Sequence, residues 1–183
     1  IDQIEIIDGI CNIKITDSYF NTLISHTLIT LGLENTFTVD HELEAKAEYS
    51  VNRWGVCFCL NTHDWMGAKV VSSAGEFQLP VDIAPQRVVD GVTLGIFPAA
   101  NEMELQAADG RTLLARSTGK ILEAEDQRNW TDNTYKIYSG SLAEPLPFIT
   151  SEGSSWSQSI SFKVGPSNRQ SDNNSKISVT EIK

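Results

Sequence analysis

The stretch SQSISFKV at residues 157–164 decides the fold class of this chain. Its apolar members Ile160, Phe162 and Val164 alternate with serine and lysine, and successive side chains of an extended strand point to opposite faces. The three apolar side chains therefore share one face, and the polar ones share the other. This regular alternation is typical of an antiparallel strand with one buried and one solvated side.

Most of the remaining chain repeats this pattern in short runs that end at Gly, Pro, Asn or Asp, and no segment carries three turns of an amphipathic helix. Such a sequence predicts an all-β fold, a single antiparallel β-sandwich with Greek-key or jelly-roll-like connections. The strongest hairpin signal is Asp109-Gly110 between apolar-rich arms. The apolar run Trp54–Leu60 predicts a central strand buried on both faces. Further strands are expected at residues 4–6, 11–15, 23–33, 35–39, 42–49, 69–71, 76–81, 92–97 and 134–138.

The length of 183 residues favours one domain. We predict a β-sandwich domain over residues 1–165 and a flexible linker over residues 166–175, where polar and turn residues follow one another without an apolar anchor. Residues 176–183 become strand-like again and form a predicted C-terminal tail. A lone strand of this length is not stable by itself, so it must pair with another strand.

The charge balance excludes two classes of partner. The net charge is −10 and the pI is about 4.7, whereas nucleic acids and anionic lipid surfaces are bound by clustered Lys and Arg. No run approaches the roughly 18 apolar residues of a membrane helix, so membrane insertion is not expected. The chain begins with Ile rather than Met, and we expect a processed, secreted or extracellular protein; Asn129 and Asn173 lie in acceptor patterns for N-linked glycan.

Three cysteines, Cys11, Cys57 and Cys59, are disulfide candidates. Cys57 and Cys59 would share one face of a strand with Cα atoms about 7 Å apart, which strains a bridge between them. Pairing of Cys11 with one of these two is the better hypothesis. The alternative is three reduced, buried thiols.

The sequence predicts no catalytic residue, no metal site and no cofactor. Cys57, Cys59 and His63 are too few for a structural zinc site, which needs four ligands. His41 follows Asp40 directly, and adjacent residues of a strand face opposite ways, so the carboxylate is poorly placed to orient the imidazole. The chain is therefore predicted not to be an enzyme.

Tryptophans are the candidate binding residues. Trp54 lies in an apolar run and is predicted to be core, whereas Trp65, Trp130 and Trp156 lie in polar turn contexts. An exposed tryptophan is typical of an interface anchor or of a platform for a sugar ring. The alternative is that each ring covers core beneath a loop.

From these observations we predict a structural subunit of an extracellular fibre, pilus-like filament or particle shell, with copies of itself or related subunits as partners. Strand exchange would use the N-terminal segment with Ile4 and Ile6, or the C-terminal tail with Ile177, Val179 and Ile182. The predicted architecture is loosely similar to that of chaperone-assembled pilus subunits, but no diagnostic motif of that family is present. The alternative function is an adhesin or a carbohydrate- or protein-binding module whose loop tryptophans hold a carbohydrate or a host protein.

Overall fold

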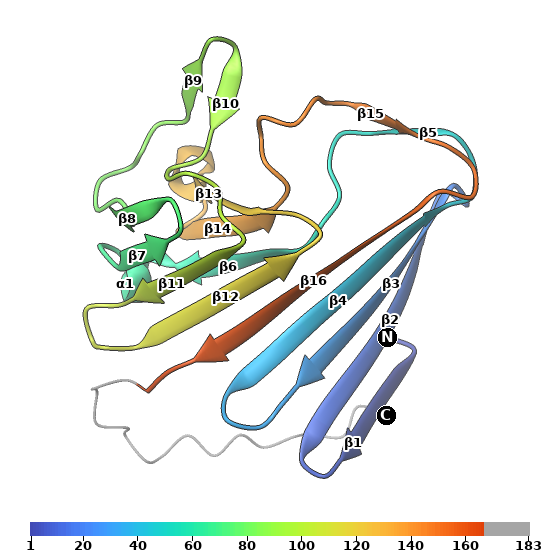
Figure 1. Cartoon of the computed structure of the whole chain (residues 1–183), viewed down its shortest axis with the longest axis horizontal. Coiled ribbons are helices and arrows are strands. Elements are labelled where there is room, and N and C mark those ends of the chain that lie inside the picture. The colour runs from blue at the N-terminus through green and yellow to red at the C-terminus, as the bar shows by residue number, and fades with distance from the viewer. Residues whose placement is uncertain (167–183) are drawn as a thin grey trace.

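The computed structural model describes residues 1–166 and is nearly all-β, with a large antiparallel sheet, so the predicted all-β class is confirmed (Figure 1). Two short helical turns accompany the strands, α1 (Thr62–Trp65) and η1 (Gln127–Trp130). The strands are β1 (Gln3–Ile7), β2 (Ile10–Tyr19), β3 (Leu23–Leu31), β4 (Thr36–Ala45), β5 (Tyr49–Val51), β6 (Cys57–Asn61), β7 (Lys69–Ser72), β8 (Gly75–Gln78), β9 (Arg87–Val89), β10 (Val92–Leu94), β11 (Glu102–Gln106), β12 (Thr112–Thr118), β13 (Leu122–Asp126), β14 (Thr134–Ser139), β15 (Phe148–Thr150) and β16 (Ser155–Val164).

The large sheet has nine strands in the order β1-β2-β3-β4-β16-β12-β11-β7-β8. The last of these strands along the chain, β16, lies between β4 and β12 and pairs antiparallel with both. The alternating stretch at residues 157–164 is therefore a central strand. A second sheet has the order β13-β14-β6, and two isolated pairs, β9 with β10 and β5 with β15, complete the fold.

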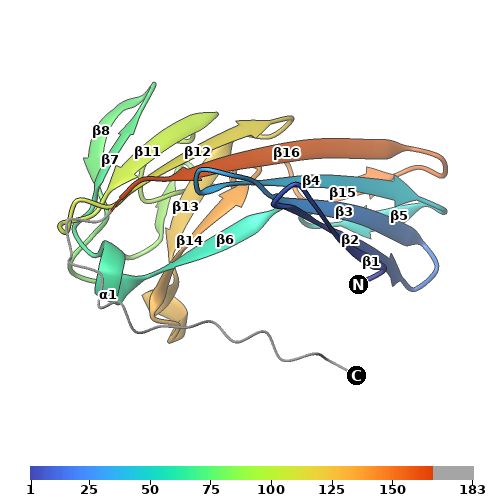
Figure 2. The same ribbon diagram turned by 90° about the horizontal axis from the view of Figure 1, so that it is seen from below.

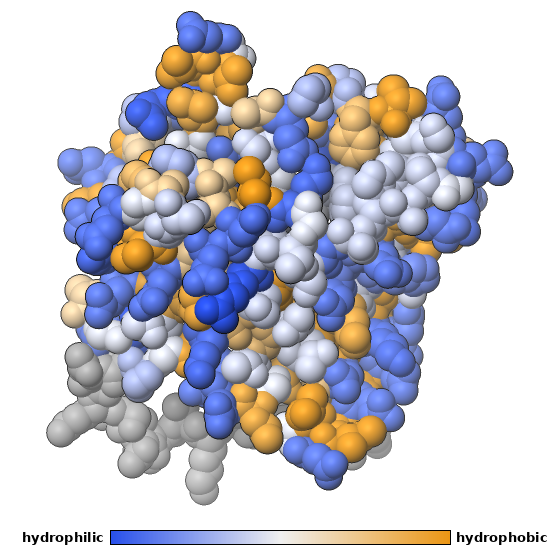
Figure 3. All heavy atoms as spheres, viewed as in Figure 1, coloured by the Kyte–Doolittle hydropathy of each residue, from blue (hydrophilic) through white to orange (hydrophobic). Residues whose placement is uncertain are grey.

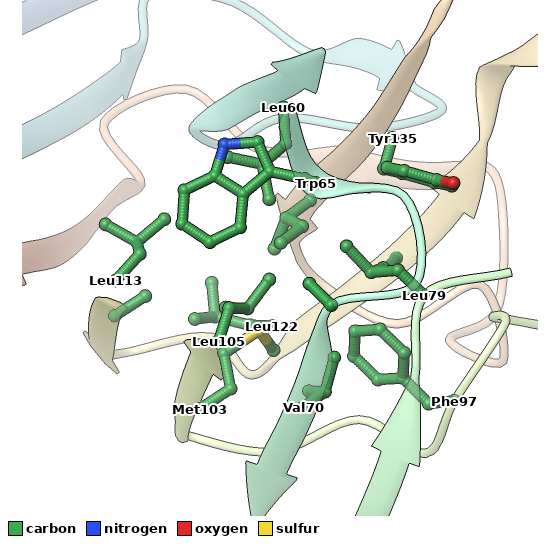
Figure 4. Packing of buried hydrophobic residues seen from close by; sticks show 14 of the residues in the cluster. Leu60, Trp65, Val70, Leu79, Phe97, Met103, Leu105, Leu113, Leu122 and Tyr135 are labelled. Atoms are coloured by element: carbon green, nitrogen blue, oxygen red, sulfur yellow. The ribbon is translucent and has the colours of Figure 1, made fainter. Parts of the chain in front are cut away.

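The three-stranded sheet packs beneath the half of the large sheet that contains β16, β12 and β11 (Figure 2). We call the side of the large sheet that looks toward this smaller sheet the inner face. Large apolar side chains fill the space between the two layers (Figure 4). Those buried there include Leu60, Trp65, Val70, Leu79, Phe97, Met103, Leu105, Leu113, Leu122 and Tyr135.

The opposite side of the large sheet, the outer face, is mostly hydrophilic (Figure 3). Along β16 it carries Ser157, Ser159 and Ser161, while Ile160 and Phe162 of the same strand are buried on the inner face. The alternation in sequence thus separates solvent from core, as expected.

A smaller apolar cluster lies at the other end of the inner face, where β5 and β15 approach β3 and β4 (Figure 2). Leu23, Leu43, Ala45 and Val51 are its buried members, and the half-buried side chains Trp54, Phe148 and Trp156 pack against them.

Several local predictions need correction. Residues 54–60 do not form a central strand, because β6 begins at Cys57 and lies at an edge of the three-stranded sheet. Within β6 only Phe58 and Leu60 contact the core, and Cys57 and Cys59 are exposed. The predicted strands at 35–39 and 42–49 are instead one strand, β4, which ends at Ala45 before the chain turns into β5. The hairpin at Asp109-Gly110 is confirmed and joins β11 to β12.

None of the helices in the described part of the chain has the length and hydrophobicity needed to cross a membrane. The predicted linker beyond Pro166 and the predicted strand-like tail lie outside the described residues, and so do Ile177, Val179 and Ile182.

Candidate ligand-binding groove

A groove of about 530 Å³ opens on the inner face, between the ends of β3 and β4 and the segment at residues 49–55. One wall is formed by inner-face side chains of the large sheet, and the other by β5 and the loop that follows it. The side chains that line it include Tyr19, Phe20, Ser25, His41, Tyr49, Arg53 and Trp54, and Gly55 lines it with its backbone.

The pairing of β3 with β4 places the side chains of the sheet wall next to one another. Thr27 lies opposite His41, and Ser25 lies opposite Leu43 in the pairing of β3 with β4. Because paired residues of neighbouring antiparallel strands project to the same side, these side chains share the inner face. His41 therefore lies beside Leu43 rather than on the outer face with Asp40.

The loop wall is held in place by close packing of Gly55 against Ser139 of β14. A Cβ atom on Gly55 would lie 2.5 Å from the Ser139 Oγ, and the φ angle of Gly55 is +150°, which side-chain-bearing residues rarely adopt. The backbone N–H of Val56 donates to the same Oγ at 3.0 Å. The loop is thus fixed to the second sheet at the point where it passes the groove.

Aromatic rings surround the groove. The ring of Trp54 lies 5.9 Å from that of His41 and 6.1 Å from that of Trp156, measured between centroids. The ring of Phe148 lies 6.1 Å from that of Trp156. These separations are those of favourable tilted and edge contacts between aromatic groups, so the Trp54 ring is held in a fixed orientation.

His41 lies on the sheet wall of the groove. Its Nδ1 is hydrogen-bonded to the Thr27 hydroxyl at 2.9 Å. Burial lowers the pKa of His41 below its usual value, and the charge of Asp17 opposes this shift only in part. The imidazole is therefore neutral at pH 7, and a neutral imidazole both donates and accepts hydrogen bonds.

Arg53 and Gln158 add polar groups on either side of the loop. The guanidinium carbon of Arg53 lies 5.7 Å from the ring centroid of Tyr138, a cation–π arrangement. Gln158 lies opposite His41 in the pairing of β16 with β4. Gln158 is 4% exposed, and its amide nitrogen and oxygen have no hydrogen-bond partner among the described residues. Its Nε2 is close to Gly55, 3.2 Å from where a Cβ atom on that glycine would lie.

This combination of groups suits a small polyhydroxylated ring. Aromatic side chains offer apolar faces for stacking, while a few placed polar groups supply orientation and specificity. Within residues 1–166, no group of three or more His, Cys, Asp or Glu side chains is arranged to hold a metal ion.

The predicted disulfide is not present. Cys11, Cys57 and Cys59 are free, with Cys11 half-buried on β2 and the other two exposed on β6. β2 belongs to the nine-stranded sheet and β6 to the three-stranded sheet. The predicted pairing of Cys11 with Cys57 or Cys59 is therefore corrected: all three thiols are free in the structure.

The three tryptophans predicted to form a binding surface have different surroundings. Trp65 is 8% exposed and belongs to the main core (Figure 4), because α1 turns its side chain inward, so Trp65 is not a surface residue. Trp130 is 51% exposed at the end of η1. Trp156 is half-buried and contacts both Trp54, which lines the groove, and Phe148. The fold does not bring the three together.

Ile4 and Ile6 lie on β1, which pairs along its whole length with β2 of the same chain through the turn at Asp8-Gly9. The segment is therefore part of its own sheet. The groove residues His41, Arg53 and Trp54 were missed as a set by sequence reasoning, although the alternation of Val39, His41 and Leu43 already places the imidazole on an apolar face.

Solved structures share the fold at low sequence identity. The α-galactosidase AgaA of Geobacillus stearothermophilus matches with a TM-score of 0.54 and 12% identity, over 86% of this chain and 24% of the other. The galactosidase domain of the α-galactosidase-sucrose kinase AgaSK matches with a TM-score of 0.53 and 13% identity, over 85% and 24%. A GalM/aldose epimerase homologue from C. elegans matches with a TM-score of 0.50 and 7% identity, over 91% and 69%.

Sequence comparison identifies a closer relationship. The D-apionate lactonase of Brucella anthropi is 30% identical over 118 residues, which are 62% of this chain and 18% of the relative. This chain thus spans less than a fifth of the length of that relative. Residues 9–167 match the family described as the N-terminal domain of D-apionate lactonase.

These findings overturn the function predicted from the sequence. The family is part of a sugar-processing enzyme and not a fibre, pilus-like or shell subunit, nor an adhesin, so the predictions of a non-enzymatic assembly role and of partner copies joined by strand exchange are wrong. The sequence pattern was misleading because alternating strands specify a β-fold, and one fold serves many functions. With its match over residues 9–167, the chain belongs to the D-apionate lactonase N-terminal domain family.

Proposed function

We propose that this chain is the N-terminal β-domain of an enzyme that hydrolyses the lactone of a sugar acid. The observation that carries the proposal is the family match over residues 9–167. Because the chain spans 18% of the lactonase that it resembles, the reaction is assigned to the whole polypeptide and not to this domain alone.

Within that enzyme, the groove beside His41 and Trp54 is the part of this domain that meets the sugar ligand. A sugar-derived lactone has a compact ring with apolar C–H faces and several hydroxyl groups. The Trp54 and Tyr49 rings supply flat apolar surfaces, and His41, Ser25 and Arg53 supply hydrogen-bonding groups around the same space. This complementarity supports the assignment of the groove to the substrate rather than to a purely apolar ligand.

The charges in the groove fit the product of the reaction. In lactone hydrolysis, water adds to the carbonyl carbon, the ring C–O ester bond breaks, and a hydroxy acid forms that releases a proton to give a carboxylate. The Arg53 guanidinium can pair with that carboxylate through charge-assisted hydrogen bonds. The neutral imidazole of His41 can exchange hydrogen bonds with a substrate hydroxyl without adding a second charge.

The test is a hydrolysis assay on the full-length enzyme that carries this domain, with the lactone of D-apionate as substrate and the released acid titrated continuously. We expect hydrolysis by the full-length enzyme. Substitution of Trp54 by Leu should raise KM by about tenfold with kcat little changed. The indole stacks on the sugar equally well in the ground state and in the transition state, so its loss weakens substrate binding without raising the barrier of the bound complex.

Trp130→Leu is the matched control, because Trp130 is also a partly exposed tryptophan but does not line the groove. It should leave KM unchanged. A full-length enzyme that hydrolyses no sugar lactone would overturn the proposed activity. An unchanged KM in Trp54→Leu would overturn the role of the groove. Export of the protein stays a prediction.

A further inference from the structure

Apolar side chains continue along the inner face of the large sheet beyond the part that the second sheet covers. One row crosses five strands in register, from β1 through β2, β3 and β4 to β16. Its members are Ile4, Ile13, Ile29, Val39 and Ile160. Exposure rises from 0% at Ile160, in the main core, to 60% at Ile4 on the edge strand.

The next inner-face row toward the β1–β2 turn is also apolar and also becomes more exposed toward β1. It runs through Ile6, Cys11, Leu31, Phe37 and Phe162. Phe162 is 3% exposed, whereas Leu31 is 44% and Ile6 is 70% exposed. We define the inner apolar face as Ile4, Ile6, Cys11, Ile13, Ile29 and Leu31 on β1, β2 and β3.

Coverage of these rows stops at β4. The Phe37 ring stacks on Phe162 at 4.2 Å, and the Phe58 ring from β6 meets Phe162 edge-on at 4.7 Å, which closes the core at that point. The three-stranded sheet does not extend beneath β1, β2 and β3 (Figure 2). All five residues of β1 are exposed.

The outer face of the same strands is polar at the level of the two apolar rows. The outer-face row that alternates with the two apolar rows contains Glu5, Asn12, Thr30, Thr38 and Ser161. The Thr30 hydroxyl donates to the Asn12 side-chain oxygen at 2.9 Å along that row. At this level of the sheet the exposed apolar side chains therefore lie on the inner face, and the outer-face apolar residues Ile7 and Ile10 are confined to the turn between β1 and β2.

We propose that the inner apolar face is the docking surface for the polypeptide that follows this domain in the full-length enzyme, an inference that rests on the proposed function. Contiguous exposed apolar residues next to a core mark surfaces that are buried against another structure. More than four fifths of the length of the lactonase relative lies outside the matched segment, and the matched family is an N-terminal domain. A second copy fits less well, because two chains of net charge −10 repel each other.

The test compares the rate of thiol labelling in this chain and in the full-length enzyme, with Cys11 replaced by alanine, which keeps the face apolar, and Cys57 and Cys59 replaced by serine in both. The paired variants are Ile4→Cys and Glu5→Cys. These adjacent residues are both exposed on β1 and face opposite sides of the sheet, so each is the control for the other. The labelling reagent is a maleimide, and a lactone hydrolysis assay is run on the same full-length preparations.

In the isolated chain both thiols should react rapidly. In the full-length enzyme the thiol of Ile4→Cys should react at least about tenfold more slowly, while that of Glu5→Cys should keep its rate, because only docked surface loses access to reagent. Rapid labelling of Ile4→Cys in the full-length enzyme would overturn the proposal, and so would selective slowing of Glu5→Cys. Slow labelling of Ile4→Cys in the isolated chain that depends on protein concentration would assign the face to a second copy instead. Protection of Ile4→Cys in a full-length protein without lactonase activity would retain the docking surface and reject only the proposed function.

Discussion

The guanidinium of Arg128 lies 2.7 Å from the carboxylate of Asp126, and the Asp126 side chain is completely buried. Arg128 also donates to the backbone carbonyl groups of Pro80, Val81 and Asp82. The pair therefore connects the end of β13 to a long connection that has no regular secondary structure.

Removal of the Asp126 charge should destabilise the domain. In Asp126→Asn the Arg128 cation keeps its carbonyl partners but loses its counter-ion, and breaking a buried pair in this way costs about 3 kcal/mol of unfolding free energy. Urea denaturation measures the loss. Glu102→Gln is the control, because Glu102 pairs with Arg116 at an exposed site and should cost less than about 1 kcal/mol. Equal losses in the two variants would contradict the structural role of the buried pair.

The same carboxylate predicts a loss of stability in acid. Burial acts to raise the pKa of Asp126, but hydrogen bonds from Arg128 and from the backbone N–H groups of Ala84 and Arg128 outweigh it, and the pKa is lowered. A carboxyl group whose pKa is lower in the folded state stabilises fully above its unfolded pKa of about 3.9. The unfolding free energy should therefore fall as the pH drops below about 4, and Asp126→Asn should show a shallower fall.

His41 predicts a second pH dependence at higher pH. Because burial lowers its pKa in the folded state, the unfolded chain binds a proton first as the pH falls below about 6.5. Stability should be highest above that value and should decrease below it. His41→Gln should remove this part of the slope in urea titrations at pH 5 and pH 7.5.

Gln158 predicts a stabilising substitution. Its buried amide has no hydrogen-bond partner among the described residues, so folding strips water from the amide without replacing the lost hydrogen bonds. Gln158→Leu removes this cost and should raise the unfolding free energy by about 1 kcal/mol. Thermal unfolding measures the change. Gln78→Leu is the control, since the exposed Gln78 amide donates to the Gly67 carbonyl at 2.8 Å, and it should give no gain. A loss of stability in Gln158→Leu would show that the amide is hydrogen-bonded in solution.

Gly55 predicts a steric effect at the groove wall. In Gly55→Ala the new Cβ would lie 2.5 Å from the Ser139 Oγ, so the variant should lose about 2 to 3 kcal/mol of stability from contact and backbone strain together. Gly75→Ala is the control for the backbone contribution, because Gly75 has a φ of +128° and an added Cβ there would lie no nearer than 3.5 Å to another atom. If both variants lose the same amount, the contact with Ser139 does not hold the loop.

The sequence by itself determined the β-class, the hairpin at Asp109-Gly110 and the two faces of β16, because these follow from turn chemistry and from the two-residue repeat of a strand. It did not determine which faces become covered. Trp65 lies in a polar stretch but is core, and Cys57 and Cys59 lie in an apolar stretch but are exposed.

Only the tertiary structure decided the groove and the docking face. The pairing of β4 with β16 sets Gln158 opposite His41, although 117 positions separate them along the chain, and the close approach of Gly55 to Ser139 brings Trp54 over the same surface. Local alternation specifies which side chains share a face of one strand. What packs on that face depends on contacts between segments far apart in sequence, whose energies a local pattern does not contain.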